Sequence, residues 1–169
     1  SYFLYSYCIP YDDGAAPNPF WGVCTLAICK LVIRRTAHAG DWVVGTGSVD
    51  TMSAGQVVYA MQVARMMSMA ELRSMDSEAN ASKVPDWFSR DYRRRLGDSI
   101  YDLASIHLDS DEAFTGSGNI AVDLGGENVL ISDHFYYFRD QAIGAASRAA
   151  SHHEARRPAN RAAAELTGP

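Results

Sequence analysis

The sequence predicts an α+β protein, built on a small twisted β-sheet or partly closed β-barrel with peripheral helices. Several short runs are rich in aromatic and β-branched residues, Gly-Asp pairs mark turns at two places, and helical patterns are short. The chain has 169 residues and is 47% hydrophobic, which is enough for one core. We therefore expect residues 1–140 to form a single domain and residues 141–169, rich in Ala and Arg, to form a helical tail.

The strands and helices are expected in the following order. The run "YFLYSYCI" (residues 2–9) is typical of a strand and precedes a loop dense in turn formers. Periodicity leaves "CTLAICKLVI" (24–33) open between strand and helix. A hairpin is predicted over residues 37–63, and "ENVLISDHFYYF" (127–138) is expected to be one strand. Ser68 and Glu71 have the spacing of a capping box, which predicts a helix starting at Met69.

Composition and charge narrow the class of protein. The net charge of -5 argues against a protein that holds long duplex DNA by bulk electrostatics. Cys8, Cys24 and Cys29 lack zinc-type spacing and are expected to be small buried hydrophobes in a reducing environment. No apolar run is long enough for a membrane span and no signal-peptide pattern opens the chain. We therefore expect a cytoplasmic protein that does not bind membranes.

The loop "APNPFWG" (residues 16–22) is the first candidate site. Pro17 and Pro19 restrict the backbone on either side of Asn18, whose amide offers a donor and an acceptor to a base edge. The rings of Phe20 and Trp21 can stack on a base, which contributes roughly 1–3 kcal/mol in single-strand binders. Two alternatives stay open: the aromatic residues fill the core, or Asn18 caps its own loop.

The segment Gly45, Thr46 and Gly47 ends an apolar run and is the second candidate site. Glycines let backbone N–H groups approach a phosphate or a base without a Cβ in the way. The alternative is an ordinary bulge or turn at a strand end. Neither GxGxxG nor GxxxxGK[ST] occurs, so the sequence does not predict a Rossmann or P-loop nucleotide enzyme.

Basic and aromatic residues supply the remaining candidates. Arg34 and Arg35 are adjacent, so at least one is expected to face solvent or a phosphate, while Arg93–Arg95 are expected in a surface loop. In the strand at 127–138, His134 should lie on the side of Tyr136 and Phe138, as the wall of an aromatic pocket, and Asp133 on the other. The alternative for His134 is a hydrogen-bonded sheet histidine.

No metal site or cofactor is predicted. The acidic and histidine side chains lack diagnostic spacing, and neither GxSxG nor HExxH occurs. The side chains weighed as metal ligands are Asp12, Asp13, His38, His107, Asp109 and Asp111.

Five blocks of sequence carry a resemblance to a known family. They are "YDDGAAPNPFWGVCTLAICK", "IRRTAHAGDWVVGTGS", "GQVVYAMQV", "GDSIYD" and "VLISDHFYYF", and they occur in this order between residues 2 and 139. Together they are similar to the nucleotide modification associated domain 2 family, although Leu31 stands where that family often has proline. The resemblance implies association with bacterial and phage systems that modify nucleotides or bases. The resemblance also implies that the candidate site residues lie within these shared blocks. They are Asp12, Asn18, Phe20, Trp21, Arg34, Arg35, Asp41, Trp42, Gly45, Thr46, Gly47 and His134.

Three hypotheses for function follow. The first is a domain that binds a nucleotide, a nucleic acid or a modified base, with the 17–21 loop and the 134–138 aromatics, Tyr136 among them, forming a pocket, and with Arg34 or Arg35 meeting phosphate. The second is an enzyme in which Asp12 or Asp13 and His134 act as general acid and base. The third is a protein-interaction domain of a modification or defence system, docking a partner through the tail at 141–166. The PUA-like folds, which are small barrels that bind bases, are the fold analogy for the first hypothesis.

Overall fold

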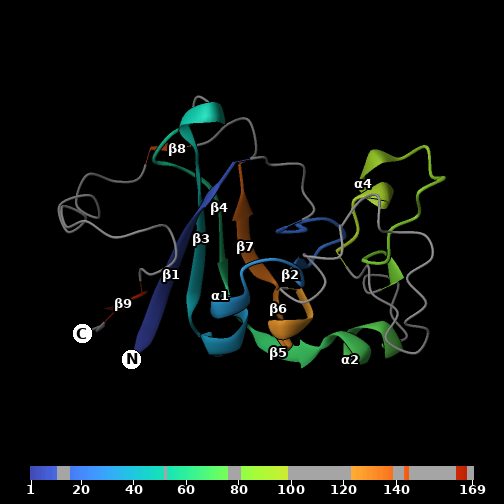
Figure 1. Cartoon of the computed structure of the whole chain (residues 1–169), viewed down its shortest axis with the longest axis horizontal. Helices are drawn as coiled ribbons and strands as arrows, with labels where there is room; N and C mark the ends of the chain where they lie inside the picture. Colours follow the sequence, from blue (N-terminus) through green and yellow to red (C-terminus); the bar gives the residue numbers. More distant parts are fainter. Residues whose placement is uncertain are drawn as a thin grey trace.

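The protein is an α+β structure in which two β-sheets pack on each other (Figure 1), as the sequence predicts. The computed structural model describes residues 1–10, 16–51, 53–75, 81–98, 123–138, 143–144 and 163–166. Within these residues neither sheet closes into a barrel. No helix in the described part of the chain combines the length and the apolar character needed to cross a membrane.

The larger sheet has the strand order β7-β4-β3-β1-β9, and β8 also pairs with β4. Strands β1 and β3 run parallel and the other neighbours antiparallel. The predicted hairpin at 37–63 is confirmed, because β3 and β4 pair directly. The bounds are β1 (Tyr2–Ile9), β3 (Trp42–Gly47), β4 (Gln56–Gln62), β7 (His134–Tyr137), β8 (Ile143–Gly144) and β9 (Ala163–Leu166).

The smaller sheet has the order β2-β6-β5 and is antiparallel. Its strands are β2 (Cys24–Leu26), β5 (Arg65–Ser68) and β6 (Asn128–Ser132). The described helical elements are short: α1 (Leu31–Thr36), η1 (Val49–Thr51), α2 (Met69–Ser74) and α4 (Tyr92–Arg95). In Figure 1, α2 follows β5 below the sheets and α4 lies apart from the larger sheet.

The chain passes between the two sheets at two neighbouring places. Residues 63–64 join β4 to β5, and Asp133 joins β6 to β7. At Asp133 the hydroxyl of Ser132 donates to the carbonyl of His134 at 2.8 Å, and the N–H of His134 lies 3.1 Å from the same hydroxyl oxygen. This local bend splits the predicted strand at 127–138 into two strands that belong to different sheets.

Alternating side chains build two core clusters. Leu130 of β6 and Cys24 and Leu26 of β2 point toward the larger sheet and join its buried side chains. Val129 and Ile131 point to the other side of the smaller sheet, where they join the α2 residues Met69 and Leu72. The smaller sheet is therefore covered on both faces, with α1 side chains also packed at the first cluster.

Local sequence signals explain both of the longer helices. The capping box of α2 is present as predicted: Glu71 N–H donates to Ser68 Oγ at 3.2 Å, and Ser68 N–H donates to Glu71 Oε2 at 2.6 Å. The ambiguous stretch 24–33 divides into β2 and α1. Cys29 and Lys30, which lie between β2 and α1, have φ of 56° and 44°. This left-handed conformation interrupts regular secondary structure, so the strand and the helix are separate.

Two expectations need correction. Cys24 is buried as predicted, but Cys8 and Cys29 are exposed. In the tail, residues 143–144 and 163–166 form strands β8 and β9 instead of a helix. Pairing with β4 and β1 satisfies their backbone groups there, which overrides the helical preference of an Ala-rich composition. The rest of the predicted tail lies outside the described residues.

Candidate functional site

One face of the larger sheet carries several of the predicted site residues. In β7, Phe135 and Tyr137 pack against the first core cluster, whereas His134 and Tyr136 are exposed. The strand register places Trp42, Gln62 and His134 in one row and Val44, Ala60 and Tyr136 in the next. We call this surface the open face; it comprises Trp42, Val44, Ala60, Gln62, His134, Tyr136 and, just after β7, Phe138.

Aromatic rings line the open face. Tyr136, which is 51% exposed, and Phe138 have parallel rings, with planes 5° apart and centroids 6.5 Å apart. Trp42 meets His134 edge-on, with ring centroids 5.3 Å apart. The open face therefore presents ring surfaces that suit a planar ligand.

A chain of polar contacts orients the rings of the open face. The Nδ1 atom of His134 lies 3.2 Å from Oε1 of Gln62, and its Nε2 atom lies 3.2 Å from the hydroxyl of Tyr136. The other end of the Gln62 amide donates to the carbonyl of Gly40 at 3.3 Å. His134 is thus a hydrogen-bonded sheet histidine, and it lies on the side of Tyr136, as the sequence predicts.

The amide of Asn18 is used inside the protein. Asn18 is fully buried, its backbone pairs with Thr25 in both directions, and its Nδ2 donates to the carbonyl of Leu96. Its Oδ1 accepts from Nζ of Lys83 at 2.8 Å. These contacts favour the scaffold alternative for Asn18, although its partners lie far along the chain and not in its own loop.

Lys83 holds the 16–23 loop from the inside. Its ammonium group donates to the carbonyls of Asn18, Phe20 and Val23 at 2.6–2.9 Å, as well as to the Asn18 side chain. Burial lowers the pKa of Lys83, while the nearby Asp98 and Cys24 oppose that shift. We call Lys83 and its four acceptors the lysine cage.

Two further titratable groups lie beside the lysine cage. Burial raises the pKa of the Cys24 thiol to about 12. Burial also raises the pKa of Asp98, an effect that the charge of Lys83, the hydroxyl of Thr25 and backbone N–H groups offset in part. The carboxylate oxygens of Asp98 nevertheless form no well-aligned hydrogen bond. Sequence reasoning missed Lys83, which belongs to no motif, and interpreted Asp98 only as part of a Gly-Asp turn.

Arg34 and Arg35 of α1 differ in exposure, and Arg35 is the one that faces solvent, as the sequence predicts for at least one of the pair. Arg34 is buried, and its guanidinium donates to the carbonyls of Asn128 and Cys29 at 2.8 and 3.2 Å. Arg35 is exposed and lies 3.7 Å from the carboxylate of Glu127. Arg34 therefore ties α1 to β6, and the described contacts place neither arginine with the aromatic rings of the open face.

The glycine segment and Asp41 have structural roles. A Cβ on Gly45 would collide with the side chains of Ile9 and Tyr59, and one on Gly47 would collide with Ser53. Thr46 Oγ1 donates to the carbonyl of Tyr7 at 3.3 Å. Asp41 accepts from the N–H groups of Phe3 and His38, both at 2.8 Å. These contacts explain the glycines by close packing, with no phosphate needed.

Phe20 and Trp21 meet the arginine-rich segment. Phe20 contacts Tyr92 of α4 and Tyr137 of β7, both edge-on, with ring centroids 6.0 and 6.4 Å apart. The guanidinium carbons of Arg93 and Arg94 lie 5.2 and 5.7 Å from the centre of the Trp21 ring. The arginines nearest the predicted aromatic loop are therefore those of α4. The sequence predicts that Arg93–Arg95 lie in a surface loop, but in the structure they belong to the short helix α4.

Asp12 and Asp13 lie outside the described residues, so their pairing with His134 stays a prediction. Among the residues described, no group of three or more His, Cys, Asp or Glu side chains is placed to hold a metal ion.

The protein is an α+β domain whose larger sheet has an exposed aromatic face. The chain matches the model of the nucleotide modification associated domain 2 family over residues 2–164. It therefore belongs to that family, as its sequence blocks suggest, and is associated with nucleotide modification. Comparison with curated proteins gave no match, and neither did comparison with solved structures.

Replacing Lys83 by Met should destabilise the protein by about 3–5 kcal/mol. The methionine side chain is similar in size but has no N–H donor, so it would leave four buried oxygens without a hydrogen bond. Urea unfolding measures the loss. The matched control is Arg35→Met, which removes an exposed and weakly paired cation and should change stability by less than about 0.5 kcal/mol. Equal, small losses in the two variants would show that the lysine cage is not a stabilising contact.

Replacing Asp98 by Asn should change how stability depends on pH. The folded-state pKa of Asp98 is raised, so its contribution is fully present below the unfolded pKa and is lost as pH rises through the folded value. The asparagine side chain cannot ionise, so the variant does not lose stability in this way. The free energy of unfolding of the variant, relative to that of the wild-type protein, should therefore increase from pH about 4 upward. Urea unfolding at a series of pH values tests this, and a difference that stays constant across the series would refute it.

Proposed function

We propose that the protein binds a nucleobase on the open face, as part of a system that modifies nucleotides or nucleic acids. The observation that carries the proposal is the parallel pair of rings formed by Tyr136 and Phe138, with centroids 6.5 Å apart on an exposed strand. A planar base can stack on the exposed surface of these rings. Membership of the family supplies the association with nucleotide modification.

The polar contacts of the open face indicate what kind of recognition to expect. His134, Gln62 and the Tyr136 hydroxyl contact one another, so much of their hydrogen-bonding capacity is already used. Stacking then supplies most of the binding energy, and stacking tolerates every base because each has a π face. We therefore expect little discrimination among bases, and we expect substituents on a base edge to be accepted.

The magnitude of stacking sets the expected affinity. Each base–aromatic contact contributes roughly 1–3 kcal/mol, and two of them correspond to dissociation constants in the millimolar range or somewhat tighter. A single mononucleotide is therefore expected to be a weak ligand.

Catalysis by Asp12 or Asp13 with His134 and docking of a protein partner through the tail remain the alternatives. Neither has a described contact that favours it over base binding.

Replacing Tyr136 by Ala should weaken the binding of nucleoside monophosphates by about 1–3 kcal/mol, because it removes one of the two stacking rings. Calorimetric titration with ordinary and edge-modified nucleotides measures the change, and the thermal unfolding midpoint should stay close to that of the unchanged protein.

Phe88→Ala is the matched control, since Phe88 is an exposed aromatic residue on a different segment. It should leave mononucleotide affinity unchanged. No binding by the unchanged protein, or equal binding by the Tyr136 variant, would contradict the proposal.

A further inference from the structure

The segment before and within α4 exposes aromatic rings among arginines. Phe88 is 97% exposed, Trp87 42% and Tyr92 40%. Residues 86–95 contain four arginines and two aspartates, although the whole chain has a net charge of -5. We call this region, together with Trp21, the arginine–aromatic surface; it comprises Trp21, Trp87, Phe88, Arg90, Tyr92 and Arg93.

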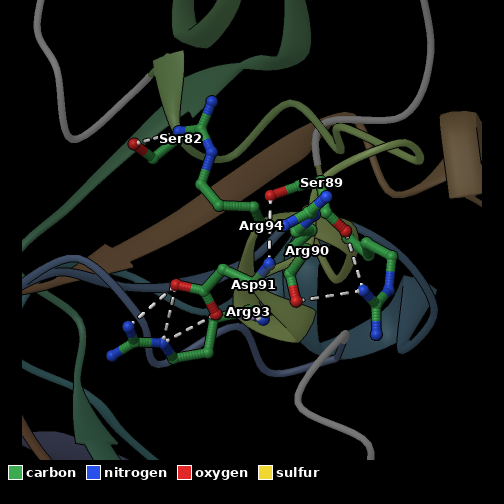
Figure 2. A network of polar contacts seen from close by, with 7 residues as sticks. Ser82, Ser89, Arg90, Asp91, Arg93 and Arg94 are labelled. Atoms are coloured by element: carbon green, nitrogen blue, oxygen red, sulfur yellow. Dashed lines mark hydrogen bonds and ion pairs between the residues drawn. The ribbon is translucent and has the colours of Figure 1, made fainter.

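The two acidic groups of the segment are occupied by local structure. Asp91 accepts the backbone N–H of Arg93 at 3.0 Å and pairs with the Arg93 guanidinium at 2.8 Å, as Figure 2 shows. Asp86 accepts the N–H of Phe88 at 3.2 Å. The exposed guanidinium of Arg90, by contrast, forms no hydrogen bond or ion pair with the other described residues. The surface therefore keeps a cation available to a ligand.

Hydrogen bonds hold the surface in shape. Arg94 donates to Ser82 Oγ at 2.8 Å, Arg95 donates to the carbonyl of Ser89 at 2.7 Å, and Asp86 N–H donates to the carbonyl of Arg94 at 2.8 Å. Figure 2 shows the contact between Arg94 and Ser82 in this network. The lysine cage then ties the segment to the 16–23 loop. These contacts fix the backbone that carries the exposed rings and Arg90, so less backbone entropy is lost when a ligand binds.

Exposed rings beside an available arginine match one chemistry best. Bases stack on aromatic rings, phosphates pair with guanidinium groups, and a single strand offers both at each nucleotide. Phe20 contacts Tyr92 of this surface on one side and Tyr137, on the core side of β7, on the other. This pair of ring contacts anchors the arginine–aromatic surface to the larger sheet.

We propose that the arginine–aromatic surface binds a single-stranded nucleic acid. This inference goes beyond the proposed base binding, because it assigns a second surface, on which a strand and not a free nucleotide is the ligand.

The test compares a labelled oligonucleotide of about 12 nucleotides, a length within the range bound by single-strand domains, with a mononucleotide. The double variant Phe88→Ala and Arg90→Gln should lower oligonucleotide affinity about 10-fold or more and leave mononucleotide affinity unchanged. The slope of log affinity against log salt should fall by about 0.7 for the lost phosphate contact. Arg35→Gln, an exposed arginine on α1, is the control and should affect neither ligand.

The outcomes separate the two proposals. Unchanged oligonucleotide affinity in the double variant would overturn the strand proposal and leave base binding intact. Loss of oligonucleotide affinity in the double variant, with no effect of Tyr136→Ala on mononucleotides, would contradict base binding on the open face. Fluorescence polarisation measures the oligonucleotide and calorimetry the mononucleotide. Binding to vesicles of phosphatidylserine and phosphatidylcholine, with no binding to the oligonucleotide, would assign the surface to a membrane and overturn the proposal.

Discussion

The bend at Asp133 is the constraint on which the rest of the structure depends. Ser132 contacts both the carbonyl and the N–H of His134, so the chain leaves the smaller sheet and enters the larger one within a single residue. The bend also fixes which side chains of β7 face the core. Because neighbouring residues of a strand point to opposite faces, a shift of one residue would bury His134 and Tyr136 and expose Phe135 and Tyr137. The aromatic surface of the sheet is thus a consequence of this turn.

Buried polar groups fix the other half of the molecule. The lysine cage satisfies buried carbonyls of an irregular loop, and in doing so it joins residues 18–23 to the segment that follows Lys83. Asp98 lies in the same buried cluster, although its carboxylate lacks well-aligned hydrogen bonds. These buried contacts fix the conformation of the loop, and in that conformation the Trp21 ring lies against the guanidinium groups of Arg93 and Arg94.

Features set by neighbouring residues could be predicted from the sequence. The capping box of Ser68 and Glu71, the hairpin of β3 and β4 and the shared face of His134 and Tyr136 all follow from spacing along the chain. Features set by distant residues could not. The direction of Arg34 depends on Asn128, and the role of Asn18 depends on Lys83 and Leu96, partners 65 to 94 positions away. A lone lysine carries no signal that it will be buried.

Mapping the bound nucleotide by NMR tests most directly whether a base binds on the open face. Titration of the labelled protein with a mononucleotide should shift the signals of the β7 backbone and of the Trp42 indole, because ring currents of a stacked base act on nearby nuclei. Signals of α2 and of the buried Arg34 should stay in place. Shifts concentrated at Gly45–Gly47, or the absence of shifts along β7 at saturating nucleotide, would contradict the account.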